Sequence, residues 1–193
     1  MSKTGKYQIC VSGAAKGETV EHGRQLAEGL GIAIAKAGHT LLTGATTGLP
    51  EYAAESYKGA GGRVSLGISP AATKVEHIIK YRLPTKPYDL ILYSGLHYVG
   101  RDALLINSAD AVACVGGRMG TLHEITIALE TETPVAILNG AGGISDEINN
   151  LLTILPNADK SLIIADTDPD RLIEKLTKAL DERHKEYTEV YSG

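Results

Sequence analysis

The chain has no tryptophan and no phenylalanine, and no apolar run approaches the ~18 residues that a membrane-spanning helix needs. Its core must therefore be built from Leu, Ile, Val and Ala, with nine tyrosines as the aromatic residues. Hydrophobic residues make up 43% of the 193 positions, which suits one α/β domain spanning residues 1–193. The first residues, Met-Ser-Lys-Thr-Gly-Lys, contain no apolar signal core, so we expect a cytoplasmic protein.

Blocks of like charge are also absent, and the net charge is -4, so we expect neither nucleic acid nor a membrane surface as a partner. The two cysteines, Cys10 and Cys114, both fall in predicted strands, where small buried side chains are typical. No His or Cys spacing predicts a metal site, and we expect no cofactor. The glycine patterns of dinucleotide-binding folds and Walker loops and the Gly-x-Ser-x-Gly elbow are missing, which argues against a dehydrogenase, an NTPase and a serine hydrolase.

Apolar runs of strand length alternate with helical patterns along the whole chain. This order predicts an α/β fold: a Rossmann-like, doubly wound, mostly parallel sheet with helices on both faces. Residues 71–88 contain Pro84 and Pro87, follow Pro70, and are expected to be irregular. The predicted strands are 7–12, 40–43, 64–68, 90–93, 111–114, 134–138 and 161–165, and the predicted helices are 17–37, 49–58, 99–108, 121–130, 144–152 and one capped by Asp168.

The most informative segment reads Val115-Gly-Gly-Arg-Met-Gly-Thr-Leu-His-Glu124 and joins a predicted strand to a predicted helix. Such a turn points backbone N–H groups and the positive end of a helix dipole at one place, which favours a phosphate. Thr121 is expected to cap the helix, and Glu124 shares its helical face. The residues predicted to bind phosphate here are Gly116, Gly117, Arg118, Met119, Gly120 and Thr121. For Arg118 the alternative is a side chain that points to solvent, and His123 is expected to be an exposed helix residue.

Other turns fall at the carboxyl ends of predicted strands, where ligands bind in doubly wound sheets. They belong to the segments Ser12–Gly13, Gly44–Gly48 and Ser69–Pro70. We therefore expect these turns to converge with the glycine-rich segment on one nucleotide. The candidate residues that they add are Ser12, Gly13, Gly44, Thr46, Thr47 and Gly48, with the two threonines alternatively serving only as turn formers.

Residues 115–124 resemble the Gly-Gly-x-Gly-Thr-x-x-Glu signature of the Lonely-guy (LOG) family, whose members are often labelled "possible lysine decarboxylase". Arg101 lies nine residues before Asp110, the spacing found in that family. The segments 42–51, 67–70 and 11–14 resemble its other ligand-facing turns, in the same order along the chain. Arg118, and Asp102 in place of a lysine, depart from the family pattern. Val-Gly-Gly at 115–117 and Thr-Leu-x-Glu at 121–124 are similar to a bacterial and archaeal branch that includes proteins similar to molybdenum-cofactor carriers.

The resemblance implies hydrolysis of the N-glycosidic bond of a nucleoside 5′-monophosphate such as AMP, with release of the free base and ribose 5-phosphate. Arg101 and Glu124 would be its catalytic residues. The alternative is a carrier of the same fold that binds a nucleotide or a molybdopterin-type cofactor without turnover. A pyridoxal-phosphate decarboxylase is disfavoured, since Lys16 is the one lysine expected at a turn that faces the cleft.

The resemblance also implies a homodimer. The segment 98–108 carries Leu104, Leu105 and Ile106 close to Arg101, more apolar surface than one helix face needs. We expect that surface to meet a second copy of the chain and to place Arg101 near the shared edge of the site.

Overall fold

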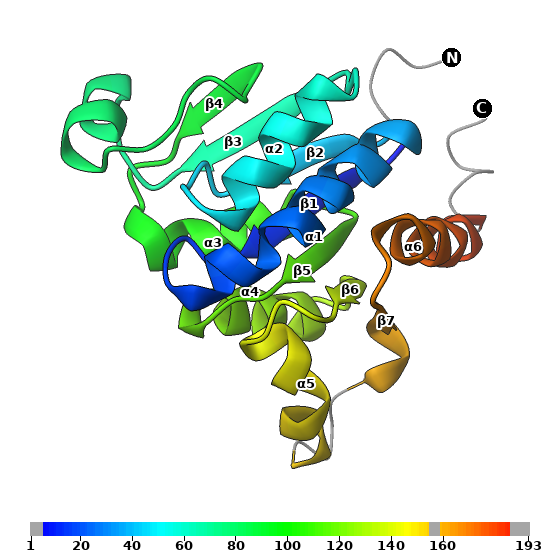
Figure 1. Ribbon diagram of the computed structural model, residues 1–193. Coiled ribbons are helices and arrows are strands. Elements are labelled where there is room, and N and C mark those ends of the chain that lie inside the picture. The colour runs from blue at the N-terminus through cyan, green and yellow to red at the C-terminus, as the bar shows by residue number, and fades with distance from the viewer. Residues whose placement is uncertain (1–5, 155–158, 186–193) are drawn as a thin grey trace.

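A computed structural model describes residues 6–154 and 159–185 (Figure 1). Seven strands form one sheet in the order β4-β3-β2-β1-β5-β6-β7, and every strand pairing among the described residues is parallel. The strands are β1 Gln8–Gly13, β2 Thr40–Thr43, β3 Ser65–Ser69, β4 Leu90–Tyr93, β5 Ala111–Val115, β6 Val135–Leu138 and β7 Ile163–Asp166. The helices are α1 Glu18–Lys36, α2 Leu49–Gly59, α3 His97–Asn107, α4 Met119–Glu130, α5 Ile144–Thr153 and α6 Pro169–Arg183, with a π-helix η1 at Glu76–Lys80 and a 3₁₀-helix η2 at Lys160–Leu162.

The strand order confirms the doubly wound fold. The chain builds the sheet outward from β1 to β4, then returns to β5 on the other side of β1 and continues to β7. The winding direction therefore reverses between β1 and β5, and the helices that leave these two strands diverge there. In open α/β sheets this reversal opens a crevice at the carboxyl ends of the strands.

Successive side chains of the strands point to opposite faces of the sheet and pack in two apolar layers, one on each face. In β1, Ile9 and Val11 pack with α1, α2 and α6, whereas Cys10 packs on the opposite face with α3, α4 and α5. Figure 1 shows α1 and α2 on one face and α3 and α4 on the other. Cys10 and Cys114 are fully buried free thiols whose pKa values burial raises, so the prediction of two small core residues is confirmed.

The predicted elements agree with the observed ones to within a few residues. The strand 40–43 and the short strand 90–93 are confirmed, and Asp168 caps α6 by accepting a hydrogen bond of 2.8 Å from the backbone N–H of Arg171. The prediction that Thr121 caps the helix is wrong, because α4 begins at Met119 and its cap position is Arg118, with no side-chain capping bond. Thr121 is therefore the third residue of the helix and does not cap it.

The segment 71–88, predicted to be irregular, contains the π-helix η1. Buried His77 holds it by two bonds to distant groups: Nδ1 lies 2.8 Å from Ser69 Oγ, and Nε2 lies 3.0 Å from the carbonyl oxygen of Pro84. These contacts join the end of β3 to the far side of the segment. The helical turn therefore depends on tertiary contacts, which sequence periodicity does not report.

No helix within residues 6–154 and 159–185 is long and apolar enough to cross a membrane. The first five residues, from which we expected no signal core, lie outside the described residues.

Candidate functional site

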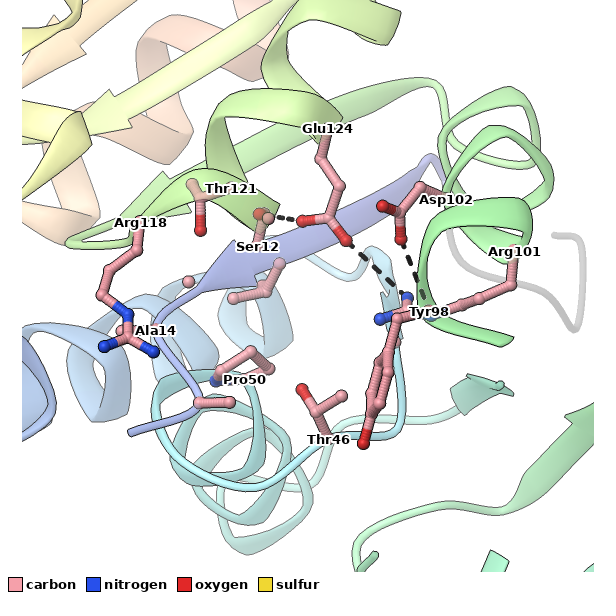
Figure 2. A pocket seen from close by; sticks show the side chains of 15 residues that line it. Ser12, Ala14, Thr46, Pro50, Tyr98, Arg101, Asp102, Arg118, Thr121 and Glu124 are labelled. Atoms are coloured by element: carbon pink, nitrogen blue, oxygen red, sulfur yellow. Dashed lines mark hydrogen bonds and ion pairs between the residues drawn. The ribbon is translucent and has the colours of Figure 1, made fainter. Parts of the chain in front are cut away.

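A pocket of about 220 Å³ opens at the carboxyl ends of β1, β2 and β5, where the winding of the sheet reverses (Figure 2). Its walls come from the turns after β1 and β2, from the start of α2, from α3 and from the first two turns of α4. The lining residues are Val11, Ser12, Gly13, Ala14, Ala15, Gly44, Thr46, Pro50, Tyr98, Arg101, Asp102, Arg118, Gly120, Thr121 and Glu124.

The glycine-rich turn forms one wall and is fixed from behind. The carbonyl oxygens of Gly116 and Gly117 accept hydrogen bonds of 3.0 and 3.1 Å from the backbone N–H groups of Ser145 and Ile144 at the start of α5. Both glycines have positive φ, 61° and 100°, in the left-handed region that other residues rarely adopt. The turn thus leads into α4 in one defined conformation, with the amino end of the helix beside the pocket.

Glu124 and Thr121 lie on the pocket side of α4, three residues apart, as predicted. Thr121 is 3% exposed and Glu124 is 8% exposed. The Ser12 hydroxyl, at the end of β1, donates a hydrogen bond to Oε2 of Glu124 (Figure 2). Desolvation raises the pKa of Glu124 above its ordinary value, and this effect outweighs the opposing influence of Arg101 and of the Ser12 hydrogen bond.

Arg101 reaches the same carboxylate from α3. Its Nη1 lies 3.7 Å from Oε1 of Glu124 and its Nε lies 3.7 Å from Oδ1 of Asp102. Arg101 is only 4% exposed, yet its Nε and Nη1 have no hydrogen-bond partner among the described residues. Buried N–H groups normally find partners, so this guanidinium is set to donate to an acceptor that the protein itself does not supply.

Gly44 makes room for that guanidinium. A Cβ at position 44 would overlap Nη1, Nη2 and Cζ of Arg101. Gly44 therefore contributes to the pocket by leaving space for the Arg101 side chain.

Asp102 and His123 extend the charged cluster toward the surface. His123 Nδ1 lies 2.8 Å from Oδ2 of Asp102, whose side chain is 7% exposed. The imidazole is 41% exposed, so it is neither a free surface residue nor a buried one. Asp102 therefore contacts Arg101 through one oxygen and His123 through the other, which fixes the carboxylate beside the pocket.

The structure brings most of the sequence-predicted residues to one pocket. The predicted residues in its lining are Ser12, Gly13, Gly44, Thr46, Arg101, Arg118, Gly120, Thr121 and Glu124. Gly48, Gly116 and Gly117 are buried and are not among the residues that line the pocket. Thr47 lines a neighbouring cavity. Met119 is 77% exposed and is not part of the pocket wall.

Sequence reasoning missed Tyr98 as a pocket residue. Tyr98 stands three residues before Arg101, and helical spacing of three places two residues on one face, so this spacing was the available signal. From the sequence, Asp102 stands out only as a departure from the family pattern. Its contact with Arg101 depends on the packing of α3 against α4, which spacing alone does not report.

Chemically, the pocket combines a helix amino end, a buried guanidinium with free N–H groups, and a carboxylate of raised pKa. The first two favour an anionic group such as a phosphate, and the third can accept or hold a proton. Within the described ranges no group of three or more His, Cys, Asp or Glu side chains is arranged to hold a metal ion.

Comparison with known proteins relates the chain to one family and to several solved structures. The family model described as "SLOG cluster4 family" matches residues 6–173. A curated protein from Archaeoglobus fulgidus, described as uncharacterized, is 34% identical over 131 residues, which cover 68% of this chain and 79% of that protein.

Two solved structures share the fold over most of their length. The molybdenum cofactor carrier protein from Chlamydomonas reinhardtii is 28% identical with a TM-score of 0.75, over 91% of this chain and 99% of the other. The molybdenum cofactor binding protein from Rippkaea orientalis is 27% identical with a TM-score of 0.70, over 90% and 96% of the two chains. DNA processing protein A from Helicobacter pylori, 18% identical with a TM-score of 0.60 over 91% and 82%, shares the fold alone.

Proposed function

The chain belongs to the SLOG cluster4 family, and from this membership and the geometry of the pocket we propose that it hydrolyses the N-glycosidic bond of a nucleoside 5′-monophosphate. The products are the free base and ribose 5-phosphate. The observation that carries the proposal is the buried carboxylate of Glu124, which lies three residues after Thr121 on the wall that begins with the glycine-rich turn. Binding an anion alone does not require a desolvated carboxylate at that position.

The phosphate fits at the amino end of α4. Gly120 and Thr121 belong to the first turn of the helix, whose leading backbone N–H groups are free to donate. Arg118, exposed and lining the pocket, adds a cation at the same end. Holding the phosphate there places the sugar one helical turn further along, beside Glu124, which converts binding energy into orientation of the reacting bond.

Glu124 and Arg101 act on the sugar and the base. The C1′–N bond breaks as its electron pair moves to the base nitrogen, and positive charge develops on the sugar, as in other glycoside cleavages. The Glu124 carboxylate stabilises that charge and accepts a proton from the water that adds to C1′. Glu124 then gives that proton to the nitrogen of the departing base, which leaves as the neutral free base. Arg101, whose Nε and Nη1 have no hydrogen-bond partner among the described residues, donates to the ligand and holds the Glu124 carboxylate in place.

The test is release of base from AMP and GMP by the purified protein, followed by chromatography, with ribose 5-phosphate measured alongside. Glu124→Gln should lower turnover by roughly 10²–10⁴-fold while AMP still binds, because the amide cannot accept the proton. Glu130→Gln removes the same charge from the exposed side of the same helix and should leave turnover unchanged. Equal base release by the Glu124→Gln protein and the unmodified protein would exclude Glu124 as a catalytic residue.

The second candidate is a carrier that binds a nucleotide or a molybdopterin-type cofactor without turnover. It is favoured by the likeness, over about nine tenths of the chain, to two solved proteins described as carrying or binding the molybdenum cofactor. The same helix end would hold the phosphate of such a cargo. Tight binding of AMP with no release of base over long incubation would favour the carrier over the hydrolase.

A further inference from the structure

A second cavity, of about 310 Å³, adjoins the pocket at Ala15, Thr46 and Tyr98, which line both spaces. Its lining residues are Ala15, Lys16, Thr46, Thr47, Tyr81, Arg82, Leu83 and Tyr98. The first pocket alone is smaller than the ~300–1,000 Å³ usual for small-molecule sites. The two spaces together reach that range, so the ligand has room to extend beyond the first pocket.

The wall of the second cavity is cationic. It contains Lys16 and Arg82 and no acidic residue, although the whole chain has a net charge of -4. Within residues 6–154 and 159–185, neither cation forms a side-chain hydrogen bond or an ion pair. Two cations without partners on a wall without carboxylates favour an anionic group, by attraction and by charge-assisted hydrogen bonds.

The wall also contains two tyrosines, which contacts hold in place. The rings of Tyr81 and Tyr98 meet edge to face with centroids 5.5 Å apart, and the hydroxyl of Tyr81 lies 2.7 Å from Nδ1 of His97. Arg82 has a φ of 54°, in the left-handed region that is uncommon for a residue other than glycine. The next residue is tied back by a hydrogen bond of 3.1 Å from the N–H of Leu83 to the carbonyl oxygen of His77.

The two cavities lie side by side and share Ala15, Thr46 and Tyr98 in their walls. Figure 2 shows Arg118 and Thr121 on one side of the first pocket, Tyr98 and Thr46 on the opposite side, and Glu124 above the space between them. A nucleotide whose phosphate lies at the start of α4 and whose sugar lies near Glu124 therefore directs its far end toward Tyr98. Tyr98 also lines the cationic cavity, so this end of the ligand lies next to that cavity.

We propose that the physiological ligand carries, besides its 5′-phosphate, a second anionic group, a carboxylate or a phosphate, and that Lys16 and Arg82 bind this group. The inference rests on the proposed placement of a nucleoside 5′-monophosphate in the first pocket. It narrows the substrate class, since a plain mononucleotide leaves the second cavity unused and an apolar substituent would face two unpaired cations.

The test compares three probes by equilibrium binding in the Glu124→Gln protein, which suppresses turnover. The probes are AMP, AMP with a dicarboxyethyl group on its exocyclic amine, and adenosine 3′,5′-bisphosphate. One of the two probes with a second anionic group should bind roughly five- to tenfold tighter than AMP, and which one does shows whether that group is a carboxylate on the base or a phosphate on the sugar. The gain should shrink in high salt, because both cations are exposed.

The double variant Lys16→Ala/Arg82→Ala should lose that gain and keep its affinity for AMP. The control Lys74→Ala/Lys86→Ala makes the same change in net charge at exposed lysines outside both cavities, and should keep the gain. If AMP binds but neither probe with a second anionic group binds tighter, or if the gain survives the Lys16→Ala/Arg82→Ala change, the inference is overturned and the proposed function is unaffected. If no probe binds at all, the ligand placement falls, and the inference with it.

Discussion

At the scale of single residues, Glu124 makes the stability of the protein depend on pH. Desolvation raises its pKa in the folded state above the ordinary value of 4.5. Between the ordinary and the raised pKa the folded protein holds a proton that the unfolded chain has released, so stability falls as pH rises through this window. Glu124→Gln removes this dependence.

We therefore expect the melting temperature of Glu124→Gln, relative to the unmodified protein, to increase as pH is raised from about 4 toward neutrality. Thermal denaturation over a pH series measures it. Glu130→Gln, on the exposed side of the helix, corrects for the change in net charge. A difference that stays constant or shrinks with rising pH would contradict the raised pKa.

Gly44→Ala should act as a change to Arg101. The new methyl group would overlap the guanidinium, which must leave the pocket. The loss of the hydrogen bonds that Arg101 is proposed to donate to the ligand should weaken AMP binding by roughly 10–100-fold. Calorimetric titration with AMP measures this. Because both substitutions remove the same interaction, the Gly44→Ala/Arg101→Ala protein should bind no more weakly than Arg101→Ala. Additive losses would show that Gly44 and Arg101 act separately.

Individual site residues were predictable where a local pattern fixes their position. Glu124 follows a glycine-rich turn in a helical register, so its side of the helix follows from the sequence. Tyr98 and Asp102 reach the site because α3 packs against α4. Their positions depend on the angle between two helices, which no local pattern encodes.

At the scale of elements, the start of α4 offers a test of the phosphate position. A Cβ at Gly120 would meet no protein atom within 4 Å, although Gly120 lines the pocket. Gly120→Ala should therefore leave folding intact, or add up to about 1 kcal/mol of stability as an alanine in a helix does, while its methyl group takes space that a phosphate needs.

The matched control is Gly59→Ala, at the end of α2, whose added Cβ likewise meets no protein atom. Both variants should melt at or above the temperature of the unmodified protein, and only Gly120→Ala should bind AMP more weakly, by roughly tenfold or more. Unchanged affinity in Gly120→Ala would place the phosphate elsewhere. Gly117 is unsuitable for this test, because a Cβ there would overlap Thr121 and its φ of 100° would be strained.

The elements themselves were predictable to the extent that their residues repeat. Strands such as Thr40–Thr43 and helices with apolar spacing are confirmed, because burial on one or both faces imposes a periodic pattern. The π-helix Glu76–Lys80 was missed because buried His77 stabilises it through Ser69 and Pro84, which lie outside it.

At the scale of the whole molecule, an apolar surface suggests self-association. It lies at one end of the sheet, on edge strand β4, the π-helix segment and α3. The expected patch needs one correction: Leu105 and Ile106 are buried in the core of the chain itself, so they are not free to meet a partner. The exposed apolar residues on these elements are Val75, Ile78, Ile79, Leu90, Leu92, Leu96, Tyr98, Val99 and Leu104.

We predict a homodimer through this surface, with a mass near twice the 20.4 kDa of one chain by light scattering at micromolar concentration. Ile79→Lys/Val99→Lys should shift the mass to that of one chain without loss of folding, since both side chains are about 70% exposed. A single-chain mass for the unmodified protein would reject the dimer, and a dimer that survives the double change would place the contact elsewhere.

The absence of tryptophan has a spectroscopic consequence at the pocket. All intrinsic fluorescence of the chain comes from its nine tyrosines, and no indole is present to absorb their emission. Tyr98 lines both cavities, and its ring meets Tyr81 edge to face. A nucleotide base that stacks on Tyr98 should therefore change the total emission directly, so the unlabelled protein reports the filling of its own site in a simple titration.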